Sequence, residues 1–328
     1  MTRITLDSWK VYPTAFDASG NCVGRLELAP VLRAFQNAVR VGDRVIVAQI
    51  QGLEDDRSFI SQAANNAFDA GAVIIAANGN RGPTIGTVSS PANAHKAIGV
   101  GSFDVQTLAQ ESTQSRGPTR DGRIKPDIQA PTNTETASNA SDTALRIFGP
   151  GTSGATPYAG GAAALARNFL LSVQQPIDPG QVYAYLILAG QQVYPFNNTT
   201  GAGPLYLPRL DDVNVVFFGK SLLRTRDRDD IPLNIGAGFN LLDAAIWWPE
   251  TIQLPGQASE EHIDFDLFLL DPNGATVARS RDNESVFQRA RATGAPLAAG
   301  RWTLRIAAPY FRVGVEKPVY WAAVAARR

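Results

Sequence analysis

Apolar positions in the first part of the chain follow two alternating spacings. Over residues 28–39 and again over residues 59–68 they recur every three or four positions, as on one face of a helix. Short, continuous apolar runs at residues 44–50, 73–77 and 97–101 predict buried strands. Strands that alternate with helices of this length predict an α/β fold, in which a parallel sheet is covered by helices.

The middle of the chain has a different composition. Residues 151–171 are rich in glycine and alanine, which predicts a helix packed tightly inside the domain. Helices are also expected over residues 178–189 and 240–246. Polar residues, glycine and proline dominate residues 196–235, and we interpret this segment as an insertion with a hairpin through residues 213–218.

In the last part of the chain, apolar and polar positions alternate strictly. The alternation covers residues 263–269 and 301–306, and a turn containing Pro, Asn and Gly occupies residues 271–274. A period of two with such turns predicts an antiparallel β-sandwich. We therefore expect two domains, an α/β domain over residues 1–250 and a small all-β sandwich over residues 251–328.

Composition and charge exclude several classes of function. The 328 residues are 44% apolar, and 30 basic side chains balance 30 acidic ones, so neither a nucleic-acid partner nor a membrane partner is expected. No apolar run approaches the ~20 residues that span a bilayer, and no signal peptide is visible at the start. The single cysteine, Cys22, excludes an internal disulfide, and His95 and His262 are too far apart to indicate a metal site.

Ser153 is the sharpest chemical feature. It lies in a glycine-flanked turn at the start of the small-residue helix, where its side chain would point outward. The first N–H groups of that helix would favour negative charge developing beside the hydroxyl. Taken alone, such a serine is more often a helix N-cap, and a phosphate loop is disfavoured because the required lysine is absent.

Four stretches, in the same order, resemble the subtilisin-like serine peptidases (subtilases, peptidase family S8). Residues 151–161 are similar to the serine signature Gly-Thr-Ser-Met-Ala-x-Pro-x-x-x-Gly, and residues 77–82 to the turn Ala-Ala-Gly-Asn-x-Gly. Residues 115–131 and 236–240 are similar to two further elements of that family. The resemblance covers roughly residues 8–246 and implies a subtilisin-like parallel sheet flanked by helices, with the N-terminal part of the fold missing.

The tail has a weaker resemblance of its own. Residues 265–274 and 300–306 are similar to the pre-peptidase C-terminal β-sandwich that follows many secreted bacterial peptidases. The subtilase resemblance implies an extracellular location, although the sequence itself does not determine the compartment.

The family resemblance also implies roles for particular residues. Ser153 matches the nucleophile, and Asn80 matches the asparagine whose side-chain amide donates to the oxyanion. An extended peptide would pair with main-chain segments that match the family's substrate-binding strands. Those segments comprise Gln49, Ile50, Gln51, Ala77, Asn78 and Gly79.

The aspartate and histidine of the family's triad have no counterpart in this sequence. In the family both precede the helix that matches residues 28–39. His95 is expected in an ordinary surface turn, His262 in the sandwich, and Asp17 in a Gly/Ser turn. Because removing the base costs subtilisin about a million-fold in turnover, we expect this chain to be nearly inactive alone.

Two main functions stay open at this stage. The first is a serine endopeptidase that acts on polypeptides through an acyl-enzyme, with the missing Asp/His half supplied upstream or by a separate chain. The second is a non-catalytic pseudo-peptidase that binds peptides or a partner protein. The absent base favours the second, as do Gln49-Ile50-Gln51 where the family has Ser-Leu-Gly.

A third interpretation gives the function to the sandwich, as a carbohydrate- or surface-binding module. No cofactor is expected. Asp264, Asp266 and Asp271 leave calcium open, although alternating acidic residues are usual on the wet face of a sandwich.

Overall fold

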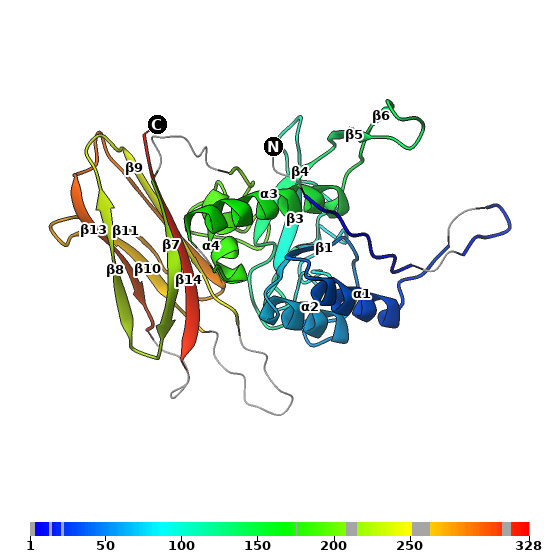
Figure 1. Ribbon diagram of the computed structural model, residues 1–328, viewed down its shortest axis with the longest axis horizontal. Helices are drawn as coiled ribbons and strands as arrows, with labels where there is room; N and C mark the ends of the chain where they lie inside the picture. Colours follow the sequence, from blue (N-terminus) through cyan, green and yellow to red (C-terminus); the bar gives the residue numbers. More distant parts are fainter. Residues whose placement is uncertain are drawn as a thin grey trace.

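The computed structural model describes residues 4–12, 15–20, 23–174, 176–207, 215–250, 263–309 and 316–327. A parallel sheet with helices forms one part of the molecule and two antiparallel sheets form the other (Figure 1). The helices are α1 (Leu28–Val41), α2 (Phe59–Asp69), α3 (Thr152–Val173) and α4 (Pro179–Ala189).

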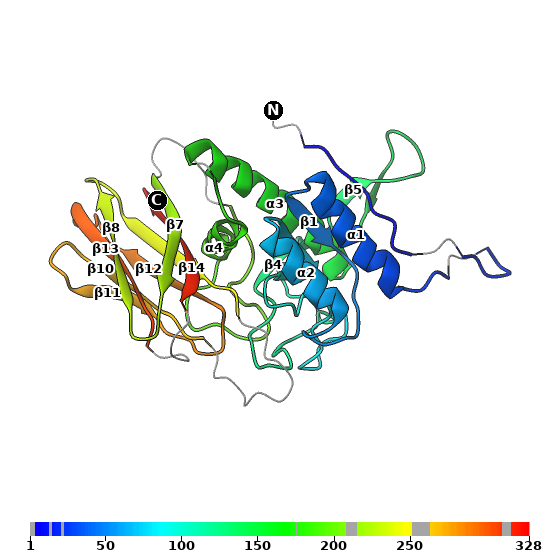
Figure 2. The same ribbon diagram turned by 60° about the horizontal axis from the view of Figure 1, so that its bottom comes forward.

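The parallel sheet has the strand order β1-β2-β3-β4. Its strands are β1 (Val45–Ala48), β2 (Val73–Ala77), β3 (Ile98–Asp104) and β4 (Ile128–Thr132). Helices α1 and α2 lie together on one side of the sheet, and α3 crosses the other (Figures 1 and 2). A parallel sheet covered by helices on both faces is what the apolar pattern predicts, and it agrees with the α/β fold that the family resemblance implies.

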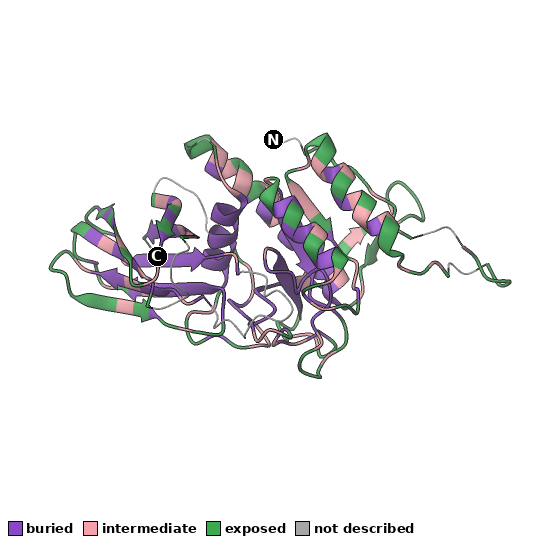
Figure 3. Cartoon of the chain, turned by 90° about the horizontal axis from the view of Figure 1, so that it is seen from below, coloured by how far each residue is buried: buried purple, intermediate pink, exposed green. Residues whose placement is uncertain are grey.

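Helix α3 packs very closely against the sheet. A Cβ atom added to Gly160 would lie 2.5 Å from Cγ2 of Val47 in β1, so only glycine permits this approach. The inner face of α3 is buried, whereas Tyr158 and Leu165 on its outer face are exposed (Figure 3). The helix is therefore only half-buried. This differs from the expectation, based on its small residues, of a helix enclosed inside the domain.

A short hairpin and two four-stranded antiparallel sheets complete the fold. The hairpin pairs β5 (Glu135–Ala137) with β6 (Leu145–Ile147). The sheets have the orders β11-β10-β13-β8 and β12-β9-β14-β7. Their strands are β7 (Val215–Leu223), β8 (Arg228–Ile235), β9 (Leu241–Trp247), β10 (Asp266–Leu270), β11 (Thr276–Ser280), β12 (Phe287–Thr293), β13 (Gly300–Ala307) and β14 (Lys317–Ala326).

The sandwich starts earlier in the chain than the sequence indicates. Strands β7 and β8 pair with β14 and β13 in different sheets, so residues 215–235 are sandwich strands and do not form an inserted hairpin. Residues 213 and 214 of the expected hairpin lie outside the described residues. The expected boundary at 250 thus falls inside the sandwich.

The helix expected at residues 240–246 is wrong, because this segment forms strand β9. All seven residues of β9 are buried. Helix α4 covers one face of its sheet and the second sheet covers the other, so β9 shows no polar alternation. Rings from both parts meet here, with Trp247 centred 4.7 Å from Tyr183 of α4 and 5.4 Å from Phe68 of α2.

Candidate active site

The N-terminus of α3 places Ser153 at the surface of the parallel-sheet part. Gly151 is the N-cap, with a φ of +114° that an L side chain rarely adopts. A Cβ atom there would also approach Nδ2 of Asn80 to 3.1 Å. Ser153 is the second helical residue and is partly exposed, so its main-chain N–H belongs to the first turn, where helical N–H groups have no intrahelical acceptor.

Asn80 lies directly against this helix start. It follows β2, and its Oδ1 accepts hydrogen bonds from the main-chain N–H of Thr152 (2.9 Å) and from the Thr152 hydroxyl (3.0 Å). These bonds fix the carboxamide and leave Nδ2 as its donor group. Among the described residues Nδ2 has no hydrogen-bond partner, and Asn80 is exposed. The structure therefore brings Asn80 close to Ser153, because the residue that Asn80 bonds, Thr152, directly precedes Ser153 in α3.

Pro157 shapes the first turn of α3. A helical residue at this position would donate its N–H to the carbonyl oxygen of Ser153, four residues earlier, but proline has no N–H. Nε2 of Gln49 donates to that oxygen instead, at 2.7 Å. The segment after β1 is thus attached to the helix by a bond that the proline makes available.

Gln51 contacts the side chain of the same serine. Its Nε2 donates to Oγ of Ser153 at 3.0 Å. Gln49 and Gln51 are two residues apart in extended chain, so both point to the same face, whereas Ile50 packs against the core. Within the described residues, the main-chain groups of residues 49–51 form no hydrogen bonds outside regular strand pairing.

The other expected substrate contacts are already paired. Ala77 is a fully buried residue of β2. Asn78 N donates to Val100 O (3.0 Å), and its carbonyl accepts from Ser89 (2.9 Å). Gly79 N donates to the Thr152 hydroxyl at 3.2 Å, and its carbonyl accepts from Ser115 at 2.8 Å. These main-chain groups hold the turn that carries Asn80, and their bonds leave little for a peptide.

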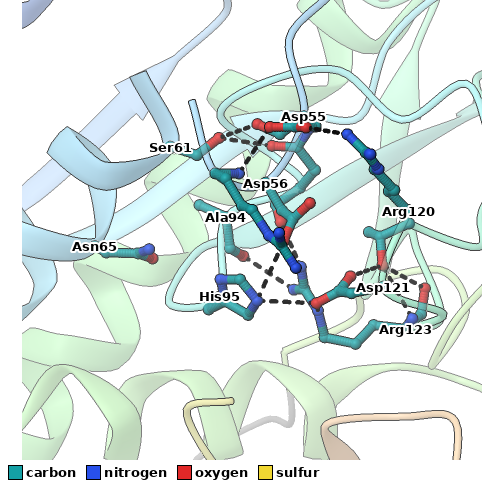
Figure 4. Close-up of polar contacts among 12 residues, drawn as sticks. Asp55, Asp56, Ser61, Asn65, Ala94, His95, Arg120, Asp121 and Arg123 are labelled. Atoms are coloured by element: carbon teal, nitrogen blue, oxygen red, sulfur yellow. Dashed lines mark hydrogen bonds and ion pairs between the residues drawn. The ribbon is translucent and has the colours of Figure 1, made fainter. Parts of the chain in front are cut away.

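His95 is buried, which corrects the expectation of a surface turn. Its side chain is 1% exposed, and its Nε2 lies 2.9 Å from Oδ2 of Asp121 and 3.5 Å from Oδ2 of Asp56 (Figure 4). Nε of Arg123 donates to the same Asp121 oxygen at 2.8 Å. The imidazole is thus engaged within this cluster and does not serve Ser153. His262 lies outside the described residues.

The electrostatics of the cluster favour a neutral imidazole. Burial lowers the pKa of His95, and Arg123 lowers it further. Nδ1 of His95 is buried without a hydrogen-bond partner, so a proton there would have no acceptor. Burial raises the pKa of Asp56, and nearby Asp121 adds to this effect. Burial also opposes ionisation of Asp121, but Arg123 and His95 outweigh it and hold its pKa below the usual range.

Asp56, His95 and Asp121 are the described residues whose grouping has metal-ligand chemistry, with ligand atoms within 4.8 Å of one another. The Arg123 guanidinium already neutralises Asp121 in this cluster, and its other nitrogens are bonded to the carbonyls of Asn93 and Ala94. The positive charge that a metal ion would supply to this cluster is thus already provided by the Arg123 guanidinium.

Among the described residues of the sandwich, the acidic side chains do not form such a group. Asp266 pairs with Arg281 at 2.9 Å, and Asp271 accepts the main-chain N–H groups of Asn273 and Ala275 in its own turn. Asp17, near the N-terminus, likewise accepts the Ser19 N–H.

Comparison with known proteins places this chain in a family. Residues 6–203, more than half of the chain, match the model of the subtilase family of peptidases. The chain therefore belongs to the subtilase family.

A search of the described helices for a membrane-spanning segment finds none with the required length and apolar character.

Individual relatives share only part of their length with it. The serine protease AprX of Bacillus subtilis is 36% identical over 139 residues, which are 37% of this chain and 30% of AprX. The prenylagaramide maturation protease PagA is 24% identical with a TM-score of 0.48, over 56% of this chain and 66% of PagA. Sphericase is 23% identical with a TM-score of 0.45, over 55% and 62%. The chain thus spans less than a third of the length of AprX.

Proposed function

We propose that the chain is the serine-bearing part of a subtilisin-type endopeptidase that forms an acyl-enzyme through Ser153. The observation that carries this proposal is the anchoring of Asn80 to Thr152, immediately before Ser153. This anchoring leaves two donors, Nδ2 of Asn80 and the main-chain N–H of Ser153, beside the hydroxyl. Two such donors are what acyl transfer requires of an oxyanion hole.

The reaction would follow from this arrangement. Oγ of Ser153 attacks the carbonyl carbon of a peptide bond, a base takes the hydroxyl proton, and the carbonyl oxygen becomes an oxyanion. The proton then passes to the leaving amine, and water hydrolyses the acyl-enzyme. The Asn80 donor would contribute about 2.7–4 kcal/mol to the transition state, as its counterpart does in subtilisin.

The reaction also needs a general base to accept the proton of the Ser153 hydroxyl. The described residues place no such base at Ser153. We propose that it comes from a segment or separate polypeptide that carries the aspartate and the histidine and docks along β1. Within the described residues β1 pairs only with β2, so its other edge is open, and Val47 on this strand is 41% exposed. An open edge with apolar side chains favours the addition of another strand.

The substrate would be an extended polypeptide. Residues 49–51 carry main-chain groups outside regular pairing, and such groups recognise a peptide by adding a strand. An extracellular location remains part of the proposal, from the family resemblance.

Imidazole in solution tests the proposed chemistry directly. If only the base is missing, imidazole should restore labelling of Ser153 by a fluorophosphonate probe, measured by mass spectrometry of the labelled peptide. The Ser153→Ala variant is the control for labelling elsewhere. Labelling that stays at the level of this control at all imidazole concentrations would reject the peptidase proposal.

A second candidate function is a non-catalytic pseudo-peptidase that binds peptides or a partner protein. It is favoured by the surroundings of Ser153, because among the described residues the side chain bonded to its Oγ is the carboxamide of Gln51, which cannot accept the hydroxyl proton as a base does. This function predicts peptide binding that is equal in the wild type and in Ser153→Ala, without imidazole-dependent labelling.

A further inference from the structure

Two glutamines hold Ser153 from the same side. Gln49 donates to its carbonyl oxygen and Gln51 to its hydroxyl oxygen, at 2.7 Å and 3.0 Å. The Gln49 bond depends on Pro157, which leaves that carbonyl without a helical donor. The main chain of the serine is therefore fixed relative to the segment that carries Gln51.

We propose that Gln51 is a positioning residue for Ser153, which orients the hydroxyl and stabilises negative charge on Oγ. The inference rests on the proposed nucleophilic role of Ser153. The family resemblance implies only peptide pairing through the main chain of residues 49–51, and the proposal adds a role for the Gln51 side chain.

The direction of the hydrogen bond determines where the hydroxyl proton points. Nε2 of Gln51 donates, so Oγ of Ser153 uses a lone pair toward Gln51 and its own proton points elsewhere. A base must therefore approach Oγ from a side other than that of Gln51. As the proton leaves, the bond from Gln51 becomes charge-assisted and stronger, so it favours the nucleophilic form over the resting form.

The same segment is the one proposed to pair with a peptide. Residues 49–51 follow β1 directly, and Gly52 then fixes the chain by exchanging main-chain hydrogen bonds with Ser90 at 2.8 Å and 3.1 Å. Gln51 is thus held between a strand and an antiparallel bridge. A peptide added along this segment would find the hydroxyl already positioned.

A cysteine in place of Ser153 makes the effect measurable without any peptidase activity. The Ser153→Cys variant is built together with Cys22→Ser, because Cys22 is the only natural cysteine. The pKa of the new thiol is then read from the pH dependence of its alkylation by iodoacetamide. Gln51→Met, which keeps the side-chain length but has no donor, should raise that pKa by about 1.

Two further variants separate positioning from simple packing. Gln51→Glu should raise the thiol pKa more than Gln51→Met does, because a carboxylate repels the thiolate. Gln49→Ala, which removes a contact to the main chain of the same residue but no donor to its side chain, should raise the thiol pKa less than Gln51→Met does. The proposal is overturned if Gln51→Met leaves the thiol pKa at its original value, or if Gln49→Ala shifts it equally, in proteins with unaltered circular dichroism.

These outcomes are independent of the imidazole experiment. A shifted thiol pKa without imidazole-dependent labelling would keep the positioning role and reject the peptidase. Labelling with an unshifted pKa would do the reverse.

Discussion

The carboxamide oxygen of Asn80 accepts two hydrogen bonds from Thr152, one from its main chain at 2.9 Å and one from its hydroxyl at 3.0 Å. Because both bonds use the oxygen, the orientation of the amide nitrogen is already fixed before any substrate binds. Preorganised donors of this kind need no reorganisation when charge develops, which is why they contribute strongly to catalysis.

The first prediction separates the two ends of this carboxamide. Asn80→Asp keeps an oxygen that can accept from Thr152 but replaces the donor with an acceptor. We expect the melting temperature to change little and the imidazole-dependent labelling rate of Ser153 to fall about 100–1,000-fold. Thr152→Val, which removes one of the two anchoring donors and the acceptor of the Gly79 N–H but keeps Nδ2 of Asn80, serves as the comparison and should lose less. A rate for Asn80→Asp equal to that of the wild type would show that Asn80 has no part in the oxyanion hole.

The second prediction concerns the bond from Gln49 to the Ser153 carbonyl. In the wild type, Gln49→Ala should lower the free energy of unfolding by about 0.5–1.5 kcal/mol, because the carbonyl loses its donor. In a Pro157→Ala background the new N–H of residue 157 can bond that carbonyl, so the same substitution should cost close to nothing. Urea denaturation of the four proteins gives the coupling as a double-mutant cycle. Additive effects would contradict the proposed link.

The sequence predicts the parallel sheet well and the sandwich less well, for a physical reason. Strands β1 and β2 alternate with α1 and α2, whose three-to-four periodicity is clear, so these four elements are visible in the apolar pattern, whereas β4 follows β3 without a helix and is not predicted. Strand β9 is covered on both faces, and its apolar run, which only Asp243 interrupts, is compatible with either a helix or a strand. Its identity depends on α4 and on the facing sheet, which are distant in the sequence.

The candidate site divides in the same way. Ser153 and Asn80 lie in short motifs, so their types and spacing can be recognised directly. The contact of Gln51 with Ser153 joins residues 102 positions apart, and the His95–Asp121 contact joins residues 26 apart. No local pattern encodes these pairs, because they arise only when the sheet brings its loops together.

The third prediction is a pH dependence that originates at His95. The groups that face it are Asp56, from the turn before α2, and Asp121 and Arg123, from the loop before β4. Because burial holds its pKa below 6.5 in the folded protein, the unfolded state binds more protons just below that pH. The free energy of unfolding should therefore decrease as pH falls from about 6.5.

The His95→Gln variant isolates this contribution. Glutamine keeps an N–H donor for Asp121 but does not titrate, so the decrease below pH 6.5 should become shallower by up to about 1.4 kcal/mol per pH unit. Asp56, whose pKa is raised, contributes in the opposite direction, and comparing the two proteins cancels it to first order. Urea titrations between pH 5 and pH 8 provide the measurement. Parallel curves for the two proteins would mean that His95 is not held neutral.

The fourth prediction concerns a carboxylate that weakens the sandwich. Burial, with a smaller effect from Asp266, raises the pKa of Asp264 to about 6, and its Oδ1 is buried without a hydrogen-bond partner. A raised pKa means that the folded state loses stability as pH rises from 3.8 through about 6, because the buried group must ionise. Asp264→Asn removes this charge. Since the side chain is partly exposed and screened, we expect a gain of about 1 kcal/mol at pH 8 and little change at pH 4.5.

Asp271→Asn should instead be neutral or destabilising at both pH values, because Asp271 accepts two main-chain N–H groups in its turn. Equal effects of Asp264→Asn at pH 4.5 and pH 8 in thermal unfolding would show that ionisation of Asp264 does not limit the stability of the sandwich.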